Sequence, residues 1–179
     1  MQRFRIEQWL PHPVEFVFAF FADPANLPRL FPAWQGARID EIELHPAPQN
    51  SASDASVAAG VGTCLRLSFR PAPLSPVRIS WVALIEHFHW NDRFCDRQLR
   101  GPFRYWRHCH RAQAHESEQT GEHGTLLIDT VEYELPLGKL GRMTNRIAVE
   151  KMIAHGFHHR HRRTAELLRE LSAGAAPRE

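Results

Sequence analysis

The chain has 179 residues and a formal net charge of +2, with 43% hydrophobic and 23% charged residues. This length fits a single domain with a sizeable core, and the composition excludes a disordered or membrane-spanning chain. The small net charge gives no reason to expect nucleic-acid binding. The N-terminal residues lack an uninterrupted apolar segment, so we expect a cytoplasmic protein without a secretion signal.

The three cysteines are Cys64, Cys95 and Cys109, which lie far apart and form no CxxC pair. An odd number of widely spaced cysteines predicts neither a disulfide framework nor a thiolate zinc site. We therefore expect three buried or half-buried thiols.

The N-terminal part of the chain predicts one strand followed by two short helices. Residues 3–10 alternate between apolar and polar side chains, which is typical of a strand. Pro13 stands where the first turn of a helix tolerates proline, and apolar residues then recur at helical spacing up to Asp23. A second short helix is predicted over residues 25–31, between two prolines.

The middle of the chain predicts a meander of antiparallel strands. The predicted strands cover residues 37–44, 63–69, 77–89, 93–100, 103–114 and 125–135. Segment 45–60 is rich in Pro, Ala and Ser and has no periodicity, which predicts a long flexible loop. After Pro136 the apolar residues return to a helical period, which predicts a long C-terminal helix and a frayed tail over 173–179.

Trp106, His108 and His110 share one face of the predicted strand 103–114, because alternate residues of a strand point the same way. If this face looks inward, an indole and two imidazoles offer stacking, hydrogen bonds and titratable nitrogens to a small molecule. If it looks outward, the two histidines are solvated. Across the hairpin, Asp129 can orient one imidazole, whereas a register slip of one residue would turn Asp129 to the other face.

The predicted C-terminal helix contains a histidine-rich segment. His155 with His158 or His159 has the spacing that aims two imidazoles at one ion. No third ligand completes that site, so we expect no native metal and no other cofactor, only adventitious capture of nickel or zinc. Basic residues of this helix, Arg160 among them, alternate with glutamates, which favours a solvated face.

Four segments together resemble the SRPBCC superfamily, which contains START lipid-transfer domains, polyketide cyclases and dehydrases, and the Bet v 1-like pollen allergens. They are residues 13–27, Gly60-Val61-Gly62-Thr63, the run from Gly101-Pro102-Phe103 into Trp106 and His110, and residues 129–138. The likeness is to a bacterial ligand-binding subgroup with no settled activity. It implies an α+β helix-grip fold, in which a curved antiparallel sheet wraps a long C-terminal helix and two short helices follow the first strand. We expect one such domain over residues 1–172.

The resemblance implies binding or transport of a small, mostly hydrophobic or aromatic molecule in a cavity between sheet and helix. The expected ligand-binding residues are Phe18, Phe21, Trp81, Trp106, His108, His110, Tyr133, Ile153 and Phe157. One alternative is an enzyme of the polyketide cyclase, dehydratase or aromatase type, with acid–base chemistry by His108 and His110 assisted by Asp129. Another is an interaction or stress-accessory module without a ligand. We expect a monomer or homodimer with no stable membrane insertion and favour a protein that is not a catalyst.

Overall fold

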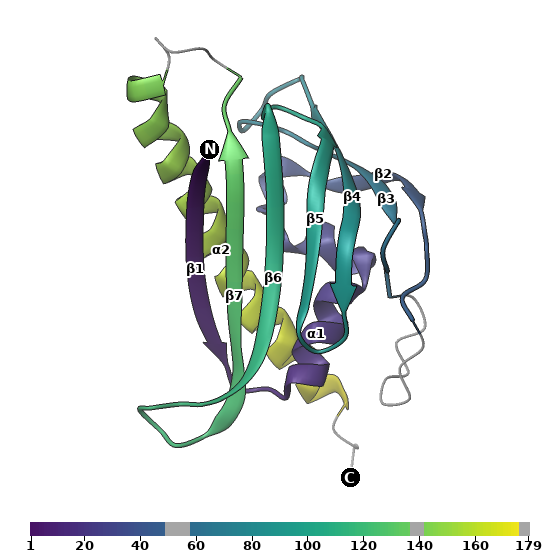
Figure 1. The fold of residues 1–179 in the computed structure, drawn as a ribbon, viewed down its shortest axis with the longest axis vertical. Coiled ribbons are helices and arrows are strands. Elements are labelled where there is room, and N and C mark those ends of the chain that lie inside the picture. The colour runs from purple at the N-terminus through teal and green to yellow at the C-terminus, as the bar shows by residue number, and fades with distance from the viewer. Residues whose placement is uncertain (49–57, 137–141, 176–179) are drawn as a thin grey trace.

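Alternating apolar and polar residues build one seven-stranded antiparallel sheet in the computed structural model, which describes residues 1–48, 58–136 and 142–175 (Figure 1). The strands are β1 (Gln2–Leu10), β2 (Arg38–Glu43), β3 (Cys64–Phe69), β4 (Ile79–His89), β5 (Arg93–Arg100), β6 (Tyr105–Glu116) and β7 (His123–Glu134). The helices are α1 (Val14–Ala22), α2 (Arg142–Ala175) and the short 3₁₀ helices η1 (Pro24–Leu30) and η2 (Ala33–Gln35). The predicted order of elements is confirmed.

The spatial order of the strands is β1-β7-β6-β5-β4-β3-β2, so strands β2 to β7 form the predicted meander. Strand β1 pairs with β7, which leaves β1 and β2 at opposite edges of the sheet. The helices α1, η1 and η2 connect these two edges. Helix α2 runs diagonally along the same side of the sheet as α1 (Figure 1). The architecture is the expected α+β helix-grip fold.

The C-terminal half of α2 is held by an apolar cluster. In this cluster Leu167 and Leu168 pack with residues of α1, η1 and the adjoining strand ends, namely Leu10, Val17, Phe20, Leu30 and Leu127. Fully burying one leucine side chain contributes about 1.5–3 kcal/mol, so the cluster fixes this end of the helix on the sheet. A second cluster lies further toward the start of α2 and contains Ile153 and Phe157.

The second predicted helix is a 3₁₀ helix, Pro24–Leu30, rather than an α-helix. Pro28 inside it has no N–H to donate to an α-helical hydrogen bond, which favours the tighter helix. Helix α2 continues to Ala175, so residues 173–175 of the predicted frayed tail are helical. Residues 176–179 lie outside the described part of the chain.

Both ends of the segment 45–60, predicted as a flexible loop, are hydrogen-bonded. The N–H of Ala47 donates to the Ala58 carbonyl, and the N–H of Gly60 donates to the His45 carbonyl. Ala59 donates to the carbonyl of Ala22 at the end of α1. These bonds anchor the segment against α1, while its central residues 49–57 lie outside the described chain.

The prediction of three thiols is wrong, because Cys95 of β5 and Cys109 of β6 form a disulfide. The two residues are directly opposite each other in the β5–β6 register. The sequence could not show this pairing, because a separation of 14 residues does not reveal which residues face each other across a hairpin. Cys64 is a free, half-buried thiol, as expected.

Reducing the disulfide is expected to lower the free energy of unfolding by about 3 kcal/mol, because the bond closes a loop of roughly 15 residues in the unfolded chain. For a chain of this size that corresponds to a fall of about 6–12 °C in Tm. Thermal unfolding with and without a phosphine reductant measures the effect. A Cys64→Ser variant should respond to reductant like the original chain, and a Cys95→Ala/Cys109→Ala variant should not respond. A reductant response in that double variant would contradict the assignment.

Candidate functional site

The inner face of the sheet carries the residues that the sequence singled out. Trp106, His108 and His110 alternate along β6 and are all buried on the side that faces α2. The β6–β7 register places Asp129 directly opposite His110, and the β5–β6 register places Asp96 opposite His108. The face that the sequence left undecided therefore looks inward, and Asp129 shares it.

Helix α2 adds both apolar and polar side chains to this face. Ile153, Phe157 and His161 follow one another at intervals of four residues, so they lie on one side of the helix, and all three are buried. The Phe157 ring lies edge-on to the His108 ring, with 5.0 Å between their centres. His161 Nε2 lies 2.7 Å from Asp129 Oδ2. Arg160, one residue earlier, reaches His110.

Asp129 is the centre of the polar cluster and is completely buried. His108 Nε2 lies 2.9 Å from its Oδ1, and His110 Nδ1 lies 2.6 Å from the same oxygen, off the direction of a straight hydrogen bond. Burial alone raises the pKa of Asp129, but its interaction with His110 and its hydrogen bonds with His108 and His161 outweigh burial and hold the pKa well below its usual range. Asp129 is therefore ionised and accepts from its imidazole neighbours.

His110 is held between two phenyl rings. Its ring centre lies 5.0 Å from that of Phe21, in a stacked arrangement, and 4.5 Å from that of Phe94. Burial, helped by the nearby His108, lowers the pKa of His110 to about 3 against the opposing effect of Asp129. The imidazole is therefore neutral, and its Nε2, 3.2 Å from an Arg160 guanidinium nitrogen, accepts from that group.

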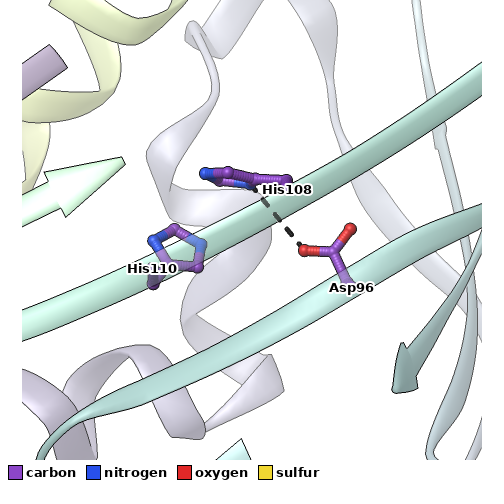
Figure 2. Close-up of side chains that lie close together, drawn as sticks. All are labelled: Asp96, His108 and His110. Atoms are coloured by element: carbon purple, nitrogen blue, oxygen red, sulfur yellow. Dashed lines mark ion pairs between the residues drawn. The ribbon is translucent and has the colours of Figure 1, made fainter. Parts of the chain in front are cut away.

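Asp96, on the neighbouring strand, points toward the His108 ring (Figure 2). Its Oδ1 lies 3.8 Å from His108 Nδ1, and its side chain is 21% exposed. Burial raises the pKa of Asp96, although His108 and Arg160 pull it in the opposite direction. The cluster thus contains two carboxyl groups with opposite pKa shifts.

Aromatic side chains lie beside the polar cluster. The Trp106 ring centre lies 5.2 Å from that of Trp81, 4.7 Å from that of Phe103 and 6.3 Å from that of Tyr133. Phe157 and Ile153 of α2 belong to the same cluster. An extended aromatic surface therefore adjoins a set of buried polar groups.

The structure brings most of the expected ligand-binding residues together, with one exception. Trp81, Trp106, Tyr133, Ile153 and Phe157 form the aromatic cluster just described, His108 and His110 lie in the polar cluster, and Phe21 stacks on His110. Phe18 instead belongs to a separate cluster with Phe88, Trp90 and Phe94. The Phe94 ring contacts both Phe18 and His110 and so links this cluster to the polar cluster.

Three members of the polar cluster were not singled out as site residues from the sequence: Asp96, Arg160 and His161. The expectation that Arg160 lies on a solvated face is wrong, because its guanidinium contacts His110 and lies 5.9 Å from the Phe21 ring centre. His161 could have been found from its spacing with Ile153 and Phe157. Asp96 alternates with Phe94 on β5, but only the strand register shows that it faces His108.

The exposed histidines of α2 do not complete a metal site within the described chain. His155 and His158 are exposed, and His159 contacts Arg162. Among the described residues, the three potential metal ligands that lie close together are Asp96, His108 and His110.

Comparisons with known proteins agree with the fold. The model of a family described as polyketide cyclase / dehydrase and lipid transport matches residues 10–156. The Zhui aromatase/cyclase from Streptomyces sp. R1128 superposes with a TM-score of 0.68 at 13% identity, covering 99% of each chain. Protein CV1439 from Chromobacterium violaceum gives 0.65 at 15% identity, over 93% of this chain and 96% of that one.

The structure of Ara h 8.0201 gives a TM-score of 0.59 at 13% identity, covering 94% of this chain and 98% of that one. No curated protein is significantly similar in sequence. Identities this low establish the fold and leave the chemistry to the residues of this chain. None of the described helices is both long enough and apolar enough to span a bilayer.

Proposed function

This chain belongs to the polyketide cyclase / dehydrase and lipid transport family of the SRPBCC superfamily, and from that premise we propose that it binds a small, mostly hydrophobic molecule between the inner face of the sheet and α2. The observation that carries the proposal is a buried polar cluster bordered by aromatic side chains. Such a combination suits a ligand with a flat apolar body and a polar group at one end. Trp81, Trp106 and Phe157 would contact the apolar body.

Arg160 is the group best placed to hold the polar end of the ligand. Its Nε is buried and has no hydrogen-bond partner among the described residues. A buried donor without a partner costs about 1–3 kcal/mol, which a ligand oxygen would recover on binding. The planar guanidinium suits a carboxylate, sulfonate or phenolate oxygen. The ligand is therefore an aromatic or aliphatic molecule with an oxygen acceptor.

Native mass spectrometry of the purified chain, followed by denaturing extraction, tests this function directly. We expect a stoichiometric apolar molecule that carries an oxygen acceptor. A chain that neither carries such a molecule nor takes one up from a mixture of fatty acids and aromatic acids would contradict binding.

Replacing Arg160 with methionine is expected to weaken binding of the anionic aromatic probe anilinonaphthalene sulfonate by about 10–100-fold, because a charge-assisted hydrogen bond is lost. Methionine keeps most of the length of the side chain and its apolar contact with Phe21. Fluorescence titration gives the affinity. Arg162→Met is the matched control, because Arg162 is exposed on the same helix. Equal affinities of the two variants would remove Arg160 from the binding site.

Acid–base catalysis is a second candidate, favoured by the Asp129–His108 pair. Asp129 fixes the orientation of the His108 ring through Nε2, which leaves Nδ1 facing Asp96. An imidazole oriented by a buried carboxylate is a common arrangement for a general base. In the mass spectrometric uptake experiment, a binding protein returns its ligand unchanged, whereas a cyclase or dehydratase returns a molecule lighter by water.

A further inference from the structure

We propose that Asp96, His108 and His110 form a binding site for a divalent transition-metal ion, with Zn²⁺ as the best fit. The three side chains come from the adjacent strands β5 and β6 and each offers a ligand atom, all within 4.8 Å of one another. Figure 2 shows them converging on one region of the inner face. Two imidazoles and one carboxylate are a ligand set that Zn²⁺ and Fe²⁺ both accept.

Hydrogen bonding leaves lone pairs directed into this region. Asp129 is an ionised carboxylate and can only accept, so the proton of a neutral His108 lies on Nε2. The proton of His110 lies on Nδ1, because its Nε2 accepts from Arg160. The remaining nitrogens, His108 Nδ1 and His110 Nε2, then carry lone pairs. His108 Nδ1 lies 3.8 Å from Asp96 Oδ1, and a ring nitrogen of His110 lies within 4.8 Å of the ligand atoms of the other two residues. These two nitrogens and the Asp96 oxygen are three acceptors close together. Among the described residues, a single protein donor reaches one of them: the Arg160 guanidinium, which donates to His110 Nε2.

The three ligand atoms lie within 4.8 Å of one another and must move closer together around an ion. Zinc bonds of about 2.1 Å in a tetrahedral site place neighbouring ligand atoms about 3.4 Å apart. The observed distance from Asp96 Oδ1 to His108 Nδ1 is 3.8 Å, too long for a hydrogen bond and close to this separation. Rotation of the Asp96 side chain, which is partly exposed, can supply the difference.

Asp129 completes the arrangement behind the histidines. Histidine ligands commonly donate their second ring nitrogen to a carboxylate, which fixes the ring and makes the ligand more basic. Asp129 Oδ1 is such a carboxylate acceptor for His108 Nε2, at a distance of 2.9 Å. The net charge of the cluster also favours a cation, because ionised Asp96 and Asp129 carry two negative charges against the single positive charge of Arg160.

Arg160 is the competing cation and must turn away when the ion binds. Its hydrogen bond to His110 Nε2 uses the lone pair that the metal needs. Since Arg160 Nε has no partner in the described chain, the guanidinium is held by that bond and by its contact with Phe21. Removing Arg160 should therefore leave metal affinity unchanged or increase it, and an increase would not occur for an ion bound elsewhere on the surface.

The test uses the full chain stripped with a chelator, in a His155→Ala/His158→Ala background that removes the exposed histidine pair. We expect one Zn²⁺ per chain with a Kd of about 1 µM or lower by calorimetry. Asp96→Asn should weaken binding by at least about 100-fold. Glu86→Gln is the control, because Glu86 is a partly exposed carboxylate paired with Arg97. Arg160→Met should bind at least as tightly as the parent.

Two results of the binding measurements would overturn the metal site: a Kd above about 100 µM in the parent chain, or equal affinities of the Asp96→Asn and Glu86→Gln variants. Anomalous diffraction at the zinc edge locates the ion without any substitution, and an ion found only outside the Asp96, His108 and His110 group also contradicts the proposal. These readouts are independent of the organic ligand. A chain that carries no apolar molecule can therefore still bind zinc, and the two proposals fail separately.

Discussion

Replacing Asp129 with asparagine is expected to lower the free energy of unfolding by about 3–5 kcal/mol, the usual cost of breaking a buried charged network at one partner. The asparagine amide has one oxygen where the carboxylate has two, and its NH₂ group would face an imidazole N–H. His108 and His161 would compete for the remaining oxygen, and the buried Arg160 would lose a compensating charge.

Urea unfolding measured by circular dichroism gives the size of this effect. Asp92→Asn is the control, because Asp92 is an exposed residue whose ion pair with Arg111 lies at the surface. Surface pairs of this kind contribute at most about 1 kcal/mol. A loss below that value for Asp129→Asn would mean that the cluster does not depend on a buried carboxylate charge.

The second large effect is a loss of stability in mild acid that depends on His110. The folded chain holds the pKa of His110 at about 3, whereas the unfolded imidazole titrates at its ordinary value of 6.5. Between these pH values the unfolded chain binds more protons, so the free energy of unfolding falls as the pH is lowered. The full slope is about 1.4 kcal/mol per pH unit.

Other groups around His110 contribute to this pH range and must be separated from it. His108 and Asp129 face it from the sheet, Arg160 faces it from α2, and Asp96 lies nearby. Asp129 is ionised in both states above about pH 5, and so contributes little there. Asp96, whose pKa is raised, acts in the opposite direction, because the folded chain then holds its proton more strongly.

A comparison of the original chain with His110→Gln isolates the effect. We expect the parent to lose about 2–3 kcal/mol more than the variant between pH 7.5 and pH 4.5. His158→Ala should behave like the parent, because His158 is exposed. Parallel pH profiles of the parent and His110→Gln would show that His110 is not kept neutral by burial.

Local sequence patterns were sufficient to predict the secondary-structure elements and their order, and the resemblance to the SRPBCC superfamily implied the helix-grip fold. Alternation predicted each strand to within a few residues, and the return to helical spacing after Pro136 predicted α2. The inward face of β6 and the position of Asp129 depended on register, which the sequence left open and the structure supplies. Within one element, spacing determines which residues share a face, and this grouped Trp106 with His108 and His110.

Contacts between residues of different strands and helices could not be predicted in the same way. The disulfide and the position of Asp96 both depend on which residue of β5 faces which residue of β6. The contact of Arg160 with His110 depends on the rotation of α2 about its axis. Because charged residues lie on both sides of this helix, the sequence does not show which side faces the sheet. The placement of Phe18 apart from Trp106 depends on where α1 crosses the sheet. These are tertiary facts, and no local period encodes them.

The Cys95–Cys109 bond lies next to every proposed metal ligand in the chain. Cys95 precedes Asp96, and Cys109 stands between His108 and His110. While the bond is intact, β5 and β6 cannot slide past each other, and a slip of one residue would send Asp96 to the opposite face. The disulfide therefore fixes the strand register that places Asp96 opposite His108. In reducing surroundings, strand pairing alone holds Asp96 at its distance from the two histidines, whereas in oxidising surroundings a covalent bond holds it as well.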